Sequence, residues 1–202
     1  EELHETTGMG ITNLNIGSIL NKQGKYEEAR QKILAALKIF RELGNKSPLW
    51  GVPFCYEKLG EIFESEGDSS LNKKESANKY RLAINEYLNA SHLREKDSSI
   101  GALYSYSKLG NIFIKTGDFN NARKYLSKSL QESTKREIKA YLPGIYKNLS
   151  ILDSLNGDYK EAYENFQKYF LYREKMQNDE AQKKVIQTRL QYDFDKKEAL
   201  SK

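Results

Sequence analysis

The sequence has one cysteine and two histidines in 202 residues, and this scarcity limits the chemistry that the chain can carry. With Cys55 alone, neither an internal disulfide nor a cysteine-based zinc site can form. No nucleophile has a base at a recognisable spacing, whether His4 or His92 is considered. The glycines are spaced as helix punctuation, so they form no phosphate-binding loop. We therefore expect no catalytic, cofactor or metal site in this segment, and an enzyme is the rival interpretation.

Prolines and long apolar runs are also scarce. Because the chain has only three prolines, its composition favours helix, and no run approaches the roughly 18 apolar residues of a membrane span. No signal peptide is visible, because the sequence starts with Glu1–Leu3 and has no early apolar run. Glu1–Leu3 is similar to the helix end at Arg41–Gly44. We expect the chain to begin inside a repeat, as a fragment of a longer protein, so missing targeting signals say little about its compartment.

Neither sign of charge dominates. Lys and Arg number 33 against 28 for Asp and Glu, which gives a net charge of +5. The charges alternate along the chain without a basic block of the kind that binds nucleic acid. We therefore expect no nucleic acid partner for this segment.

What the chain does have is an internal repeat. One marker signal occurs four times, at Leu14–Gly17, Glu57–Gly60, Ser107–Gly110 and Lys147–Ser150. A second glycine follows seven residues after each marker, at Gly24, Gly67, Gly117 and Gly157. Self-similarity at this spacing predicts a solenoid of stacked units, which offers a long groove more often than a closed pocket.

Each unit is predicted to be helix A, a tight turn and helix B. The marker glycine lies in the middle of helix A, where it costs about 1 kcal/mol relative to alanine. Close approach of helix B to this residue would offset that cost. In the fourth repeat another small residue, Ser150, takes the place of the marker glycine. The small residues that share this contact are Gly17, Gly60, Gly110 and Ser150 on helix A and Ala29, Ala122 and Ala162 on helix B.

The turns carry a second set of signals. The turn glycines permit positive φ, and Asp118 and Asp158 are expected to cap the next helix instead of binding metal. The second repeat differs, because Gly67 to Ser76 is four residues longer than Gly24 to Ala29. This insertion, within residues 68–75, is either a longer polar turn or a loop that contacts a partner.

These features resemble the tetratricopeptide repeat family, in its long-repeat class of about 40 residues. The resemblance covers residues 11 to about 170, although Asn13, Tyr56, Tyr106 and Tyr146 replace the marker tryptophan. It implies an all-α, right-handed solenoid of four helix pairs with a C-terminal capping or connector helix. The implied organisation is a solenoid over residues 1–172, with repeats at about 11–43, 48–96, 98–136 and 138–172, and a C-terminal helix over residues 173–202.

In this family helix A lines a concave groove that binds a protein or peptide. The resemblance places in the groove Ile11, Leu14, Ser18, Asn21, Phe54, Glu57, Glu61, Glu64, Tyr104, Ser107, Asn111, Lys115, Lys147, Ile151 and Ser154. Three of them, Glu57, Glu61 and Glu64, would form either an acidic stripe that favours a basic partner or a solvated face. The carboxylate clamp of some relatives is incomplete here, because Leu14 and Ser18 replace its first pair.

The tail carries a second resemblance. Arg173–Lys202 contains no glycine or proline and is predicted to be one helix, whose first half caps the last repeat and whose charged second half, Leu190–Leu200, continues as a connector. This arrangement is similar to bacterial membrane signalling proteins in which repeats precede an output domain. It implies the sensory region of a two-component sensor histidine kinase, periplasm-facing or cytoplasmic, with a possible homodimer through the C-terminal helix. A soluble scaffold or a peptide-responsive transcriptional regulator is the alternative.

Overall fold

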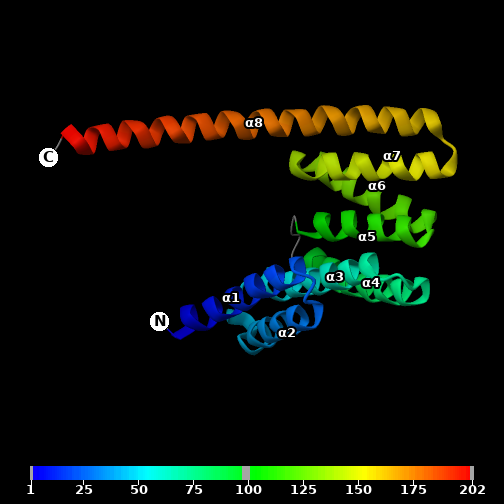
Figure 1. Cartoon of the computed structure of the whole chain (residues 1–202), viewed down its shortest axis with the longest axis horizontal. Coiled ribbons are helices and arrows are strands. Elements are labelled where there is room, and N and C mark those ends of the chain that lie inside the picture. The colour runs from blue at the N-terminus through cyan, green and yellow to red at the C-terminus, as the bar shows by residue number, and fades with distance from the viewer. Residues whose placement is uncertain (1, 97–100, 201–202) are drawn as a thin grey trace. The chain divides into compact units, whose positions relative to one another are not determined.

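The computed structural model describes the backbone of residues 2–96 and 101–200 and the side chains of residues 4–96 and 101–190. Within these ranges the chain consists of eight α-helices and two short 3-10 turns (Figure 1), so the predicted all-α class is confirmed. The elements are α1 (Glu2–Lys22), α2 (Tyr26–Glu42), η1 (Gly44–Lys46), α3 (Gly51–Ser69), α4 (Lys73–Lys96), α5 (Ala102–Thr116), α6 (Phe119–Lys135), η2 (Lys139–Tyr141), α7 (Leu142–Asn156) and α8 (Tyr159–Leu200).

The helices form antiparallel pairs in the predicted order, and the chain divides into two compact units at Glu132 and Ser133. In the first unit, one cluster between α1, α2 and α3 buries Leu14, Ile33 and Phe40. Leu14 is 2% exposed, so its predicted place in the groove is wrong: it belongs to the core. A second cluster buries the side chains of α3, α4 and α5 around Tyr87.

The predicted close approach at the marker glycines is confirmed. A Cβ atom on Gly17 would lie 2.5 Å from the Cδ1 atom of Ile33, and one on Gly110 would lie 2.5 Å from the side chain of Leu126. At the fourth repeat the Ser150 hydroxyl donates to the Ala162 carbonyl at 2.8 Å. The small residue thus lets helix B lie almost directly on the helix A backbone.

The turns confirm most of the predictions made for them. Gly24, Gly117 and Gly157 have φ values of 75°, 79° and 84°, in the left-handed region that favours glycine. Asp118 caps α6, because its Oδ1 atom accepts the backbone N–H of Asn121 at 3.1 Å.

The second repeat corrects the prediction that Gly67 is a turn glycine. Gly67 lies buried inside α3, and a Cβ atom there would lie 2.7 Å from the ring of Tyr80. The turn comes later, where Asn72 Oδ1 accepts the backbone N–H of Lys74 at 2.9 Å. The extra residues therefore lengthen both helices of this pair. Two glycines seven residues apart, Gly60 and Gly67, each pack against a tyrosine ring.

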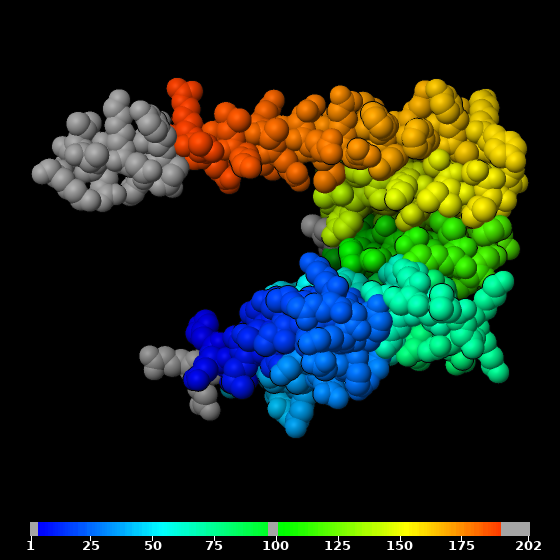
Figure 2. Space-filling view, viewed as in Figure 1, coloured from blue at the N-terminus to red at the C-terminus, as the bar shows by residue number. Residues whose placement is uncertain are grey.

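In the second unit, α8 starts as helix B of the fourth pair and continues without a break across Arg173. Tyr172 stacks on Tyr146 of α7, with ring centroids 5.5 Å apart. Beyond this contact every side chain from residue 177 to 190 is exposed. Figure 2 shows this stretch extending past the helix pair instead of folding back over it. The side chains of the predicted connector beyond Leu190 lie outside the described residues, and the division at 172 and 173 stays a prediction.

The close approach at Gly17 gives a stability test. We expect Gly17→Ala to lower the free energy of unfolding by about 1–2 kcal/mol, because overpacking against Ile33 exceeds the gain in helix propensity. Gly8→Ala, on the same helix with no atom within 4 Å of the added Cβ, should be neutral or stabilising. Urea denaturation measures both. In an Ile33→Val background the cost of Gly17→Ala should fall; an unchanged cost would contradict the steric explanation.

Candidate functional site

The predicted acidic residues of α3 lie against basic residues of α4 and α5 in the first unit. Glu57 is 2% exposed and receives hydrogen bonds from Arg94 Nε at 2.9 Å and Arg94 Nη2 at 3.0 Å. Ser105 Oγ donates to the same carboxylate at 3.1 Å. Burial raises the pKa of Glu57, although Arg94 opposes this shift. Glu57 therefore connects α3 to α4 and α5 through buried hydrogen bonds and is not a surface charge.

Glu64 is the centre of a larger network. It is 6% exposed and accepts hydrogen bonds from Lys108 at 2.9 Å, Lys115 at 3.0 Å and Asn111 at 3.1 Å, all on α5. The Tyr87 hydroxyl adds a fourth at 3.2 Å. Burial alone would raise the pKa of Glu64, but the two lysines outweigh it and lower the pKa.

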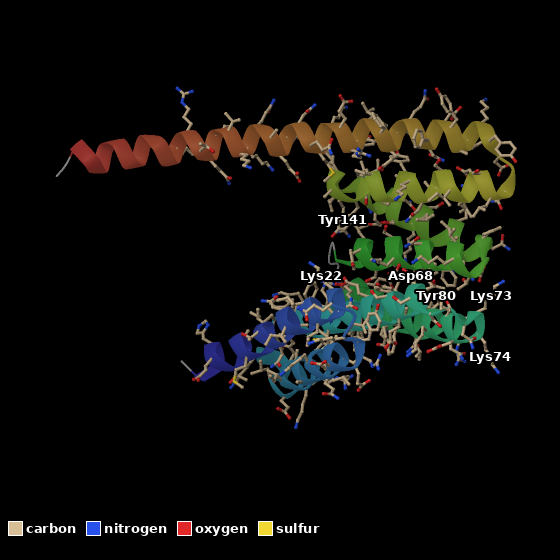
Figure 3. The ribbon with its side chains drawn as sticks, in the orientation of Figure 1. Lys22, Asp68, Lys73, Lys74, Tyr80 and Tyr141 are labelled. Carbon is tan, nitrogen blue, oxygen red and sulfur yellow. The ribbon has the colours of Figure 1, made fainter. Side chains whose placement is uncertain are left out.

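The remaining acids on this face are also paired. Both oxygens of Glu61 accept from Lys58 at 2.9 Å, and the Tyr104 hydroxyl donates to Glu61. One turn further, Asp68 accepts from Lys115 at 2.7 Å and from the Tyr80 hydroxyl at 2.6 Å; Asp68 and Tyr80 are labelled in Figure 3.

These contacts correct the expected acidic stripe. The carboxylates of Glu57, Glu61, Glu64 and Asp68 meet four cations, Lys58, Arg94, Lys108 and Lys115. Each of these carboxylates is paired with a cation, so α3 does not offer them as free negative charges to a basic partner. The predicted stripe is instead a set of ion pairs that holds the second repeat against the third. One sequence signal could have revealed it: α5 carries Lys108, Asn111 and Lys115 at the helical spacing that matches the acids of α3.

Other predicted groove residues keep accessible surface. On α3, half-buried Phe54 lies between the Trp50 ring, at 6.1 Å, and the Lys58 ammonium, at 5.0 Å. On α5, Ser107 and Asn111 are half-buried, and in the second unit Lys147 and Ile151 on α7 are exposed. Within the first unit, the accessible part of the predicted groove thus includes aromatic, hydroxyl and amide groups, together with exposed Ile11 and with Lys115, which is paired with Glu64 and Asp68.

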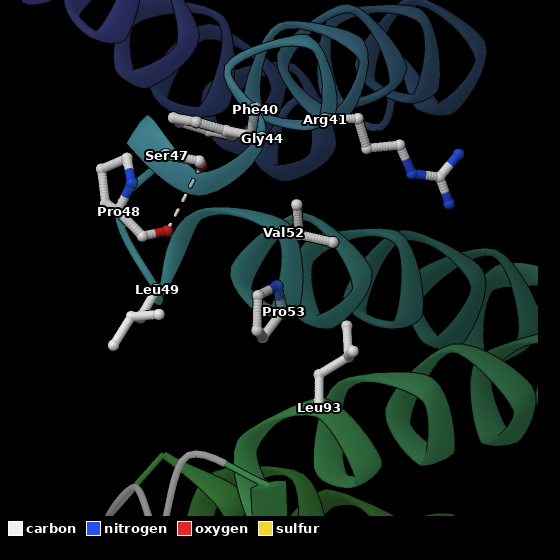
Figure 4. Close-up of a pocket in the computed structure, with 9 residues that line it drawn as sticks. All are labelled: Phe40, Arg41, Gly44, Ser47, Pro48, Leu49, Val52, Pro53 and Leu93. Carbon is white, nitrogen blue, oxygen red and sulfur yellow. Dashed lines mark hydrogen bonds between the residues drawn. The ribbon is translucent and has the colours of Figure 1, made fainter.

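A separate pocket of about 320 Å³ lies where α2 ends and α3 begins (Figure 4). Arg41 is the charged residue of its lining, and its Nη2 atom donates to the Tyr56 hydroxyl at 2.5 Å. The other lining residues are apolar or small: Phe40, Gly44, Ser47, Pro48, Leu49, Val52, Pro53 and Leu93. Such a lining suits an apolar side chain, and its one serine hydroxyl, on Ser47, donates to the Pro48 carbonyl at 3.4 Å.

Cys55 and His92, the residues whose side chains could carry chemistry, do not line this pocket. Cys55 is fully buried in the α1–α3 core, and burial raises its pKa to about 12. His92 is exposed on α4. Among the described residues, no group of three or more His, Cys, Asp or Glu could hold a metal ion. None of the described helices is long and apolar enough to cross a membrane.

Comparison with known families identifies part of the chain. The family model for the tetratricopeptide repeat matches residues 12–43 and 103–135, which hold the α1–α2 and α5–α6 pairs. The chain therefore contains tetratricopeptide repeats, as the resemblance predicted, and such repeats are typical of protein-interaction modules. No curated protein matches the chain significantly.

Solved structures support the same fold. The crystal structure of BtubC (BKLC) from P. vanneervenii matches with a TM-score of 0.67 and 19% sequence identity. The match covers 84% of this chain and 64% of that one, so this chain spans less than two thirds of its length. The predicted all-α tetratricopeptide-type solenoid is confirmed. The resemblance of the tail to sensor histidine kinases stays a prediction.

The pairing of Glu64 with two lysines can be tested by measuring the stability of the fold at different pH values. Because the pKa of Glu64 is lower in the folded chain than its ordinary value of 4.5, its charge stabilises the fold above that pH. This contribution is lost as the pH falls through the folded pKa. We expect Glu64→Gln to cost about 3 kcal/mol at neutral pH, and the difference from the wild type to shrink below pH 4.5. Urea unfolding at stepped pH measures it.

The control for this experiment is Glu28→Gln, an exposed carboxylate on α2, which should change stability by less than about 0.5 kcal/mol at any pH. A Glu64→Gln deficit that stays constant with pH would contradict an ionic role for Glu64.

Cys55 gives a test of burial. With a pKa of about 12, only about one thiol in ten thousand is ionised at pH 8, and the buried sulfur is out of reach of a reagent. We expect iodoacetamide to modify Cys55 only as fast as the core opens, and immediately in denaturant. A Leu71→Cys variant, with its thiol on the fully exposed hairpin tip, should react at once with one equivalent. Rapid labelling of native Cys55 would contradict the buried core.

Proposed function

We propose that this chain is a non-catalytic module that binds a protein or peptide along the helix A faces of α1, α3 and α5. The observation that carries the proposal is the neutralised surface between α3 and α5. With its acids paired, this face offers the Phe54 ring, the Ser107 hydroxyl and the Asn111 amide. Such groups bind an uncharged or amphipathic segment through hydrogen bonds and apolar contacts. The sequence predicted a strongly basic partner, but the unpaired carboxylates that would attract it are not present on this face.

We further propose that the parent protein is a membrane-bound bacterial signalling protein, with a two-component sensor histidine kinase as the leading class. Support comes from α8, which belongs to the fourth repeat at Tyr159 and continues as the same helix to Leu200. A change in the repeats that moves the start of this helix would also move its far end. The partner must then bind two states with different affinity. A homodimer through α8 is compatible with this mechanism but is not required by it.

The parent class is tested by the gene sequence that follows Lys202. A span of about 20 apolar residues and then a helix with a phosphoacceptor histidine would support the sensor. A stop codon shortly after Lys202 would contradict it and favour the soluble scaffold or the peptide-responsive regulator.

The binding face is tested with peptides selected on the full chain from a random display library. We expect Ser107→Arg, which places a bulky cation on the α5 face, to weaken binding of the selected peptides at least about tenfold in fluorescence polarisation. The matched control is Ser127→Arg on the exposed side of α6, which should leave the affinity unchanged. Equal effects of the two substitutions, or an effect of Ser127→Arg alone, would contradict the proposed face.

A further inference from the structure

The connection between the first two repeats is apolar although it is in contact with water. Residues 43–50, which join α2 to α3, contain one charged residue, Lys46. Leu49 and Trp50 are adjacent in this connection and are 76% and 39% exposed. The connection at residues 136–141, between α6 and α7, instead carries three charged residues. Exposed apolar residues that gather in one place are typical of a contact with another molecule.

This connection forms part of the pocket between α2, α3 and α4 (Figure 4). Leu49, Val52 and Leu93 supply aliphatic side chains to its lining, and the fully buried Phe40 also lines it. The ring of Trp50 packs edge-on against Phe40, with ring centroids 5.7 Å apart. A molecule in the pocket would therefore lie close to the exposed part of Trp50.

Arg41 brings a positive charge to the pocket. Its guanidinium lies 5.9 Å from the centre of the Tyr56 ring and donates to the Tyr56 hydroxyl at 2.5 Å. Within the described part of the chain, no carboxylate lies at ion-pair distance from Arg41, whereas Arg30 and Arg94 are each paired with a glutamate of α3. A guanidinium has five N–H donors, so Arg41 can still bind a carboxylate while it contacts Tyr56.

We propose that this pocket binds an acidic segment of a partner protein. An apolar side chain of the segment enters between Leu49, Val52 and Leu93, and an aspartate or glutamate beside it pairs with Arg41. Charge complementarity favours such a partner, since residues 38–53 carry three basic side chains and one acidic side chain.

The cations around the pocket also favour an internal segment over a chain end. The one acidic residue, Glu42, already pairs with Lys38 at 3.8 Å, and Lys46 is exposed in the same connection as the pocket wall. Arg41 and Lys46 are thus left for the partner. An internal segment can place an acid on each side of its apolar residue, whereas a chain end offers its terminal carboxylate on one side only.

The open walls of the pocket favour a protein over a small molecule. A small-molecule site normally covers about 70–90% of its ligand. This pocket measures about 320 Å³, and Leu49 in its wall is itself 76% exposed. A single apolar side chain suits this volume, and the backbone that carries it would contact Leu49 and Trp50 outside the pocket.

The test begins with a display library of segments held at both ends within a carrier protein. The library is depleted on an Arg41→Glu variant of the full chain and then selected on the wild type. We expect the surviving segments to share an apolar residue with acidic residues on both sides, because depletion removes every segment that binds without Arg41. Survivors that lack acidic residues, or no survivors at all, would overturn the proposal.

One surviving segment, made as a labelled peptide with blocked ends, gives affinities by fluorescence polarisation. We expect Arg41→Gln to weaken binding about fivefold and Leu49→Ser to weaken it about threefold. The matched controls are Lys32→Gln, another exposed cation on α2, and Leu71→Ser, another exposed leucine, which should leave the affinity unchanged. Binding should also shift the emission of Trp50, the only tryptophan of the chain, and an unchanged emission would contradict this location.

Charge reversal separates a direct ion pair from a folding defect. A peptide with its acids replaced by lysine should bind Arg41→Glu more tightly than it binds the wild type, which also shows that the variant is folded. If a peptide with a free C-terminal carboxylate and no acidic side chain binds as well as the acidic one, the site takes chain ends and the proposal is overturned. Ser107→Arg should leave this binding unchanged, since α5 contributes no residue to the pocket, so a failure here does not affect the test of the helix A faces.

Discussion

The close contact of two helices at one residue without a side chain is the constraint on which the repeats depend. At Gly17 and Gly110, the side chain of helix B lies where a Cβ atom would be, so no larger residue fits without a shift. This contact fixes the rotation of helix B about its own axis. It thereby decides which residues of helix B face the next repeat, and at α2 these include Tyr26 and Arg30, which contact Ser69 and Glu66 of α3. The stacking of repeats is thus a consequence of packing within each pair.

The second repeat keeps this constraint while it lengthens both helices. Its extra turns place Asp68 opposite Lys115, near the end of α5, where a shorter α3 would have no residue. The longer pair therefore extends the ionic contact with the third repeat. Buried ion pairs add little net stability, but breaking one of them is costly, so they favour one register over others. Here they fix which repeat lies on α3.

Much of the fold could be predicted from the sequence, because small-residue markers and turn glycines act locally. The helix pairs, the close approach at Gly17 and Gly110 and the turns at Gly24 and Gly117 all follow from residues near one another in the chain. The prediction for Gly67 is wrong because a glycine seven residues after a marker fits a turn and a second packing site equally well. The spacing rule alone could not separate these two roles.

The candidate site was harder to predict, because its electrostatics come from another helix. Glu57 and Glu64 look like an exposed acidic face when α3 is considered alone, and only α4 and α5 supply Arg94, Lys108 and Lys115. Whether a charged residue is free depends on contacts between residues about 40 positions apart, which a helical pattern does not reveal.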